Sequence, residues 1–273
     1  MDQEQLKGAL LRVAEAPLDF TLLFSGKKSK KINGLYKAES REIIIHNRNF
    51  TDENLLMYTA VHEYAHHLHA CARGGVLSAR SHSAEFWSIF HGLLEEAEKK
   101  GLYRNVFAAS PELAALTDLI REEYLRKNGD LLKELGESLL RAFELCASLG
   151  GRFEDYLDRV LRIPRAAAEA AMKMHHYNIN SAVGPDNMRF LAGIRNEGER
   201  NAAEEALLKG KSPDTVRVEA KRRAQGLAVP QGEEKDAGPR SVLEKEKARL
   251  ERTIAHLSER LKVIERALAP PPP

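Results

Sequence analysis

DENLLMYTAVHEYAHHLHACA, residues 52–72, is the stretch that decides the fold of the first part of the chain. Its apolar residues recur every three or four positions, which is the period of an amphipathic helix. Gly74 and Gly75 follow it, and paired glycines are typical of a helix end. We therefore expect a helix over about 52–72, with these residues on its apolar side: Leu55, Leu56, Tyr58, Thr59, Val61 and Ala65.

Within this helix, residues 62–66 have the pattern HExxH. His62 and His66 are four positions apart, so both imidazoles lie on one helix face and can reach one metal ion. Glu63 is rotated about 100° from His62, close enough to contact water at the metal without binding the metal itself. The alternative is a polar helix face that is merely rich in histidine, but the rest of the helix is apolar.

A third metal ligand has to come from another segment, because zinc in a catalytic site takes three protein ligands and one open position. The metzincin pattern HExxHxxGxxH requires glycine at 69 and histidine at 72, where this chain has His69 and Ala72. The best candidate is His82, in HSAEFW at the start of the next expected helix, and Glu85 is the second. His69 stays open as a ligand. His67 and His69 are otherwise expected at the surface or beside the ligands, and His91 in the core or beside them.

The segment EIIIHNRNFTDENLLMYTAVHEYAHH followed by HSAEFW resembles the small zinc metallopeptidases of the SprT-like and YgjP-like group. The resemblance covers roughly residues 18–100. It implies a zincin-like fold, a Zn²⁺ cofactor, His62, His66 and His82 as the zinc ligands, and Glu63 as the general base. One departure is the connection between His66 and His82, which is longer than that group's short connection.

The resemblance implies hydrolysis of peptide bonds by a zinc-activated water, with Glu63 taking the proton and passing it to the leaving amine. The developing oxyanion also needs a stabilising donor. The sequence leaves four side chains open for this role: Tyr58, Tyr64, His69 and Arg80. The region 34–46 either pairs with an extended substrate or is an ordinary edge strand.

Short β-rich segments precede the histidine helix, at 20–24, 34–38 and 43–46. The lysine-rich sequence GKKSKK, residues 26–31, lies between the first two, so we expect a hairpin or small meander with the lysines at its tip. These lysines either form a solvated tip or hold DNA near the peptidase site. With an amphipathic helix at 3–14 and another at 83–98, residues 1–108 are expected to form an α+β, zincin-like metallopeptidase domain.

Everything after Pro111 has the periodicity of helices, so residues 109–224 are expected to form an all-helical domain. The expected helices span 112–127, 131–148, 153–161, 165–176, 185–195, 199–208 and 213–224. Residues 151–176 have the layout of a helix-turn-helix, with a turn at 162–164, although a generic helical bundle fits equally well. The DNA-contacting candidates are Arg165, Lys221, Arg222 and Arg223; a solvated charged face is the alternative for the last three.

Composition narrows the class of protein further. Charged residues make up 30% of the 273 residues and the chain has two cysteines, so a disulfide framework is excluded and a reducing, cytoplasmic location is expected. Cys71 and Cys146 are expected to be inert thiols. The N-terminal MDQEQLKGALL lacks the basic start of a signal peptide, and no apolar run approaches the ~18–20 residues of a membrane helix.

The C-terminal residues have two distinct compositions. Residues 225–241 are rich in Gly, Pro and charge, which is typical of a linker. Over 242–269, apolar residues alternate between two heptad positions, which predicts a coiled coil and a homodimer formed through it. One position is held by Leu243, Leu250, Leu257 and Ile264, and the other by Ile254, Leu261 and Leu268, with Lys247 interrupting it once. A single helix on the domain surface is the alternative.

Together these features predict a cytoplasmic zinc metalloendopeptidase that acts on DNA-associated proteins and does not bind membranes. The first alternative is a DNA-binding regulatory protein with a structural or degenerate zinc site. The second is an assembly protein whose coiled coil is its main function. Glu63 favours the peptidase, because a purely structural zinc site has no use for a general base.

The heptads predict that the full chain is a dimer and that truncation at Ala237 gives a monomer. The reason is that the apolar seam is buried only when two copies pair. Light scattering on both proteins checks this. A full-length monomer at tens of micromolar, ample for a dimer of ordinary affinity, would contradict the coiled coil.

Overall fold

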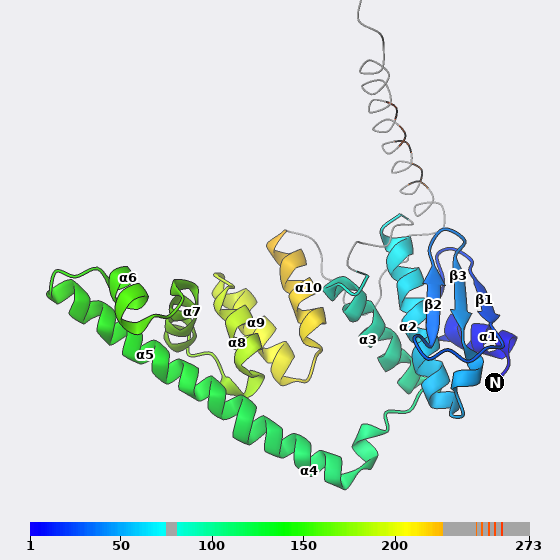
Figure 1. The fold of residues 1–273 in the computed structure, drawn as a ribbon, viewed down its shortest axis with the longest axis horizontal. Coiled ribbons are helices and arrows are strands. Elements are labelled where there is room, and N and C mark those ends of the chain that lie inside the picture. The colour runs from blue at the N-terminus through cyan, green and yellow to red at the C-terminus, as the bar shows by residue number, and fades with distance from the viewer. Residues whose placement is uncertain are drawn as a thin grey trace, which may run out of the picture. The chain divides into compact units, whose positions relative to one another are not determined.

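The computed structural model describes residues 1–74 and 81–225, together with Glu244, Lys247, Glu251, Ile254 and Ser258 (Figure 1). Contacts within the chain define two compact units, and the chain passes from the first to the second between Arg104 and Asn105. The expected linker lies outside the described residues except for Gln225. The expected coiled coil lies outside them except for the five single positions, which are helical.

The first unit combines three helices with three short strands. In chain order they are α1 (Gln3–Val13), β1 (Thr21–Phe24), β2 (Gly34–Lys37), β3 (Glu42–Ile45), α2 (Glu53–Ala72) and α3 (Ala84–Lys99). Side-chain caps fix the helix starts: Asp2, Asp52 and Ser83 each accept a hydrogen bond from a backbone amide of the first turn.

The strand order in the sheet is β1-β3-β2, with β1 parallel and β2 antiparallel to β3. The expected hairpin with GKKSKK at its tip is therefore wrong, since β3 lies between β1 and β2. The hairpin is instead β2–β3, which turns through Arg41 at a φ of 53°. Ile43 and Ile45 are completely buried, so the central position of β3 follows from its apolar content.

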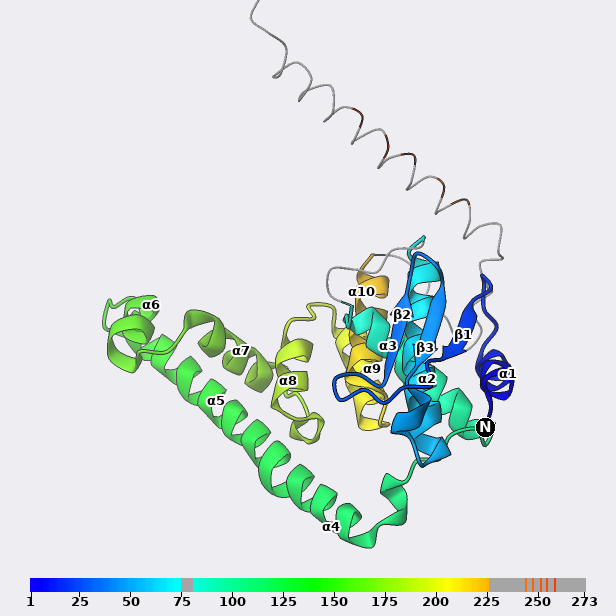
Figure 2. The same cartoon turned by 45° about the vertical axis from the view of Figure 1, so that its right-hand side comes forward.

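The sheet, α2 and α3 form successive layers (Figures 1 and 2). Alternate strand residues Leu22, Tyr36, Ile43 and Ile45 are buried, and they join the core formed with α1, α2 and α3. The helix α3 packs on α2 through Phe86, Phe90 and Leu93. The HExxH segment of α2 therefore lies in the middle layer, between the sheet and α3.

The second unit is helical throughout its described elements. They are α4 (Pro111–Leu119), a π-helical segment (Ile120–Arg126), α5 (Lys127–Ser148), α6 (Phe153–Asp155), a second π-helical segment (Tyr156–Leu161), α7 (Arg165–His176), α8 (Pro185–Ala192), α9 (Glu197–Leu208) and α10 (Pro213–Ala224), with short 3₁₀ turns at Phe107–Ala109 and Ser181–Val183. With the small sheet of the first unit, this confirms an α+β chain with a large helical part.

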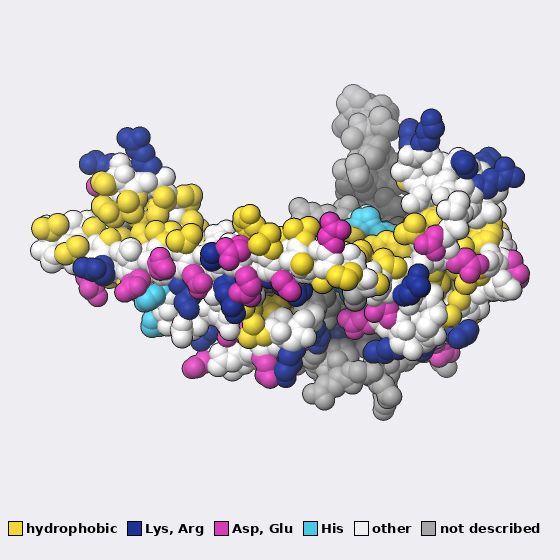
Figure 3. Space-filling view, turned by 90° about the horizontal axis from the view of Figure 1, so that it is seen from below, with side chains coloured by type: hydrophobic (Ala, Val, Ile, Leu, Met, Phe, Trp, Pro, Cys, Tyr) yellow, Lys and Arg dark blue, Asp and Glu magenta, His cyan; other side chains and the backbone are white. Residues whose placement is uncertain are grey.

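One helical run covers residues 111–148, where the sequence predicted a break near Gly129. Gly129 is buried, and a Cβ there would lie 2.7 Å from the sulfur of Met188 and 2.9 Å from Cβ of Ser181. This glycine is thus needed for close packing and does not end the helix. Figure 3 shows apolar side chains in a row along one face of the second unit. Leu131 and Leu145 are among the exposed apolar residues of this helical run.

The helix, turn and second helix expected over residues 151–176 are present in the second unit. Helical residues 153–161 are followed by Arg162, which is left-handed at a φ of 55°, and then by α7. The Ala168 and Ala171 side chains of α7 are buried against α5, where Gly136 leaves no room for a Cβ. Across the described residues, no helix is long and apolar enough to span a membrane.

Candidate metal centre

Three imidazoles from two helices converge at one point of the first unit. His62 and His66 lie one turn apart on α2, and His82 immediately precedes Ser83, the N-cap of α3. The ring centroids form a nearly equilateral triangle: 5.0 Å from His62 to His66, 5.1 Å from His62 to His82 and 5.0 Å from His66 to His82. In the described part of the chain, no other group of three His, Cys, Asp or Glu side chains has metal-binding geometry.

The spacing of this triangle fits one metal ion. One nitrogen from each histidine lies within 4.8 Å of the others, and the Nε2 atoms of His62 and His82 are 3.1 Å apart. Two imidazole nitrogens on a tetrahedral zinc ion are about 3.3 Å apart, given Zn–N bonds of about 2.05 Å. A hydrogen bond between His62 and His82 would explain that one distance, but it leaves the approach of His66 unexplained.

The Nδ1 atom of His66 gives a second indication of a ligand. It is buried without a hydrogen-bond partner. A buried polar atom of this kind is normally satisfied by protein, water or an ion. The residues present therefore fit a metal ion held by three imidazoles.

Burial keeps the two α2 histidines in the state that binds metal. It lowers the pKa of His62 to about 4, with the nearby His82 as a smaller cause. It also lowers the pKa of His66 to about 3, again helped by neighbouring histidines. Both rings are thus neutral at pH 7 and offer a lone pair without first losing a proton.

Phe86 forms the apolar floor of the site. It is fully buried, its ring is stacked on His66 at 4.2 Å, and its centroid lies 5.0 Å from His62 and 4.9 Å from His82. The ring of Trp87 stacks on the ring of His82, with the two centroids 5.5 Å apart. The contact of both aromatics with the three histidines was not predicted from the sequence. The spacing of four between His82 and Phe86 was the available signal.

Glu63 leaves α2 on the side of strand β2. A Cβ on Gly34 would lie 2.8 Å from Cγ and 2.9 Å from Oε1 of Glu63, so the carboxylate rests directly against the bare backbone of β2. Burial raises the pKa of Glu63 to about 7, and a hydrogen bond from the backbone amide of Tyr36 partly opposes the rise. The contact between Gly34 and Glu63 was not predicted from the sequence.

The other candidate ligands on α2 and α3 lie outside the triangle. Glu85, on the first turn of α3, is not a member of the metal-binding group. His69 is buried with both ring nitrogens unpartnered and does not join the group. His67 donates from Nε2 to the carbonyl of Leu18 and accepts from the Tyr36 hydroxyl at Nδ1, so its role is structural. Of the two positions expected for His67 and His69, at the surface or beside the ligands, the surface position is wrong, since they are 0% and 2% exposed.

The two tyrosine candidates for oxyanion stabilisation differ in how far their side chains are exposed. Tyr64 is fully buried and its hydroxyl donates to the carbonyl of Ala14 at 2.7 Å, so this candidate is wrong. Tyr58 lies one turn before His62, is 39% exposed and packs edge-on against Phe90, which also contacts His62. Arg80 lies outside the described residues. His91 is half-buried and stacks on Trp87, as expected of a residue beside the site.

The candidates for DNA contact lie on two helices of the second unit. Arg165 begins α7 and is ion-paired with Asp158. Lys221, Arg222 and Arg223 form the last turn of α10, where Arg223 lies 3.9 Å from Glu219. Arg165 is thus neutralised locally.

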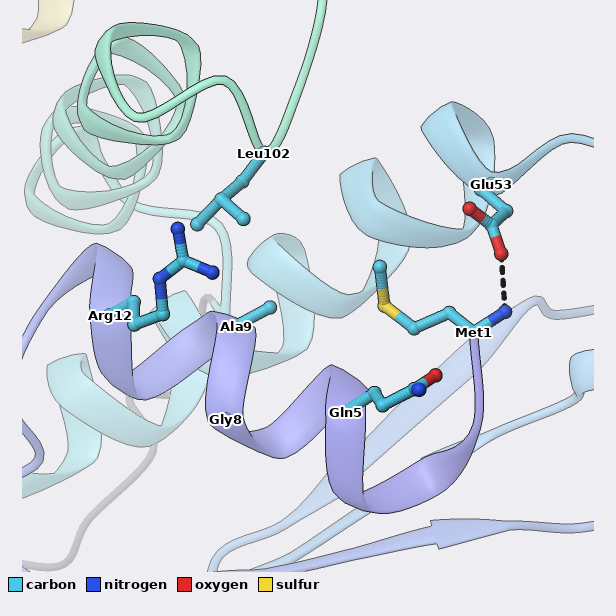
Figure 4. Close-up of a pocket in the computed structure, with 7 residues that line it drawn as sticks. All are labelled: Met1, Gln5, Gly8, Ala9, Arg12, Glu53 and Leu102. Carbon is cyan, nitrogen blue, oxygen red and sulfur yellow. Dashed lines mark hydrogen bonds and ion pairs between the residues drawn. The ribbon is translucent and has the colours of Figure 1, made fainter.

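Two open hollows lie away from the three histidines. One, of about 450 Å³, is lined by α1 and the start of α2, where the amine of Met1 pairs with Glu53 (Figure 4). The other, of about 480 Å³, lies in the second unit between α5 and α7, with Phe143, Phe153 and Met172 on its walls. Neither contains Glu63 or a histidine of the triangle.

Comparison with known proteins gave no match: no family model, no curated protein and no solved structure is significantly similar to this chain.

The first prediction from this geometry concerns the ligands. His82→Ala removes one corner of the triangle, so the purified protein should lose most of its bound metal. Glu85→Ala, three residues away and outside the group, is the matched control and should retain the metal. Metal analysis by mass spectrometry checks both. Loss of metal from the Glu85 variant but not from the His82 variant would show that the ligand set is wrong.

The second prediction concerns the contact between β2 and Glu63. Gly34→Ala places a methyl group within 2.8 Å of Cγ of Glu63, so the carboxylate must move. We expect a loss of about 1–3 kcal/mol in the free energy of unfolding, as for overpacked cores, with the metal content unchanged. Denaturant unfolding measures the first and metal analysis the second.

Gly92→Ala on α3 is the control, because no atom lies within 4 Å of its Cβ position. It should be neutral or stabilise the protein by up to about 1 kcal/mol. Equal stability of the Gly34 variant and the wild type would show that Glu63 does not rest on β2.

Proposed function

We propose that this chain is a zinc-dependent metallopeptidase with His62, His66 and His82 as the zinc ligands and Glu63 as the general base. The observation that carries the proposal is the convergence of three imidazoles with a buried carboxylate on the adjoining helix position. Three nitrogen ligands leave one position of a tetrahedral ion open, which is the arrangement of catalytic zinc. The resemblance to SprT-like and YgjP-like peptidases supports the same assignment.

A zinc ion at this site would activate a water molecule for attack and polarise the scissile carbonyl. Glu63 accepts the proton of the attacking water and passes it to the leaving amine. The bare backbone at Gly34 leaves room for the carboxylate, and the Tyr36 amide orients it. A nearby cation favours the ionised carboxylate, the form that accepts a proton. Of the two tyrosines considered for stabilising the oxyanion, Tyr58 remains a candidate.

The substrate is proposed to lie along β2. This strand is at the edge of the sheet, because only its β3 side is paired. An extended peptide can add to such an edge through main-chain hydrogen bonds. Glu63 lies against this strand at Gly34. A peptide on β2 would therefore pass close to the general base.

A structural metal site, as in the alternative of a DNA-binding regulator, explains Glu63 less well. Burying a carboxylate that no cation neutralises costs free energy, as its raised pKa reflects. A structural site gains nothing from this cost, whereas a general base needs a pKa close to the working pH. We extend the proposal to DNA-associated protein substrates because the second unit has the layout of a helix-turn-helix.

Glu63→Gln tests the mechanism. The amide is nearly the same size as the carboxylate but cannot accept the proton, so peptide hydrolysis should fall by about 10²–10⁴-fold. Metal content and the unfolding transition should stay those of the wild type. Cleavage of an unfolded protein such as casein, followed by gel electrophoresis, measures the rate. Undiminished cleavage by this variant would refute Glu63 as the base.

A further inference from the structure

We propose that residues 26–33, which we name the lysine loop, form a binding site for the phosphate backbone of nucleic acid beside the metal centre. The loop connects β1 to β2 and carries Lys27, Lys28, Lys30 and Lys31. The evidence that this loop binds nucleic acid does not depend on the proposed peptidase activity. Its meaning, that DNA-bound proteins are brought to the peptidase, rests on the proposed function.

The loop is fixed by hydrogen bonds to the segment after β3. The Asn49 side-chain amide donates to the carbonyl of Ser29 and to Oδ1 of Asn33, and Asn49 Oδ1 accepts from the Ser29 amide. At the start of the loop, the Gly26 amide donates to Oδ1 of Asn47. Two asparagines therefore hold the loop at both its start and its centre. The four lysines therefore extend from a loop whose backbone is held in place by hydrogen bonds.

The four loop lysines differ from every other lysine of residues 1–104. All four are exposed, and none forms an ion pair with a described residue. The remaining lysines of this unit each lie within 4.0 Å of a carboxylate: Lys7, Lys37, Lys99 and Lys100. Arg48, exposed on the 3₁₀ turn (Asn47–Asn49) that fixes the loop, also makes no ion pair with a described residue. The loop and the turn that fixes it thus carry five cations, none of which is ion-paired with a described residue.

The loop leads directly into the strand that contacts the general base. Only Ile32 and Asn33 separate Lys31 from Gly34, whose backbone lies against Glu63. Three residues span at most about 11 Å, so a phosphate held by Lys31 lies within about 20 Å of Glu63, which is about the width of a DNA duplex. A protein attached to such a DNA would have its chain within reach of β2.

The chemistry of the loop favours a phosphate backbone over base recognition. Lysine ammonium groups are compact charges that bind phosphate without reading sequence. Residues 26–33 contain no aromatic side chain on which an unpaired base could stack. Ile32 is the one large apolar residue of the loop, so the anchors that a docked acidic peptide would need are scarce. We therefore assign the loop to double-stranded DNA of any sequence.

The test is binding of a fluorescein-labelled 20-base-pair duplex, measured by anisotropy on zinc-loaded protein. K27Q/K28Q/K30Q/K31Q should bind at least 10-fold more weakly than the wild type at 50 mM salt. Four phosphate contacts contribute about 3.6 to the slope of log affinity against log salt, so this part of the affinity falls about 100-fold between 50 and 200 mM salt. The variant should lose most of this slope.

K7Q/K37Q/K99Q/K209Q is the charge-matched control, because it removes four lysines that are each paired with a carboxylate. It should bind within about threefold of the wild type. Equal losses in the two variants would show that net charge alone drives binding and would overturn the site. Unchanged binding by the loop variant, or no binding by the wild type at 50 mM salt, would overturn it as well.

Two further measurements distinguish this DNA site from an acidic protein partner and from a DNA site in the second unit. Polyglutamate competing as well as the duplex at equal charge would point to an acidic protein partner and overturn the assignment to DNA. Losses confined to a variant of α10, K221Q/R222Q/R223Q, would place the DNA site in the second unit instead. The binding measurement is repeated on Glu63→Gln, which keeps all four lysines. Failure of the peptidase proposal therefore leaves the DNA result interpretable, and failure of DNA binding leaves the peptidase assay unaffected.

Discussion

The packing of Phe86 against the histidines of α2 is the contact on which the three-histidine cluster depends. Ser83 caps α3, and this fixes both the residue before the helix, His82, and the residue one turn inside it, Phe86. When Phe86 packs beneath His62 and His66, His82 is carried to the third corner of the triangle. Burial of a phenylalanine ring contributes about 2–3 kcal/mol, so hydrophobic packing positions ligands that repel one another when protonated.

Helix α2 buries several polar side chains, among them Glu63, His66 and His67. These side chains differ in whether the protein supplies their hydrogen-bond partners. His67 is satisfied at both nitrogens by Tyr36 and Leu18, as a structural residue must be. His66 keeps a buried nitrogen without a partner, and Glu63 keeps a carboxylate whose ionisation burial opposes. Uncompensated groups of this kind are expected where a site is organised for a ligand, because the ligand supplies the missing interaction.

Much of the first unit was predictable from local sequence, because caps and periodicity are local properties. The bounds of α2 and α3, and the positions of His62, His66 and His82, follow from the HExxH spacing and the HSAEFW segment. Strand order was not predictable, since residues 20–46 are equally compatible with a meander. The continuous helix through Gly129 was not predictable for a related reason. A glycine that ends a helix and one that permits close packing look alike until the partner, here Met188, is known.

The position of β2 links these observations. Because β3 occupies the centre of the sheet, β2 is left as an edge whose backbone faces α2. Because of this position, Gly34 lies against Glu63 and the Tyr36 amide donates to the same carboxylate. The Tyr36 hydroxyl hydrogen-bonds to His67. The lysine loop ends where β2 begins, at Gly34. A meander in the expected order would have paired β2 on both sides. Glu63 would then have faced a closed sheet, with no free strand edge beside it.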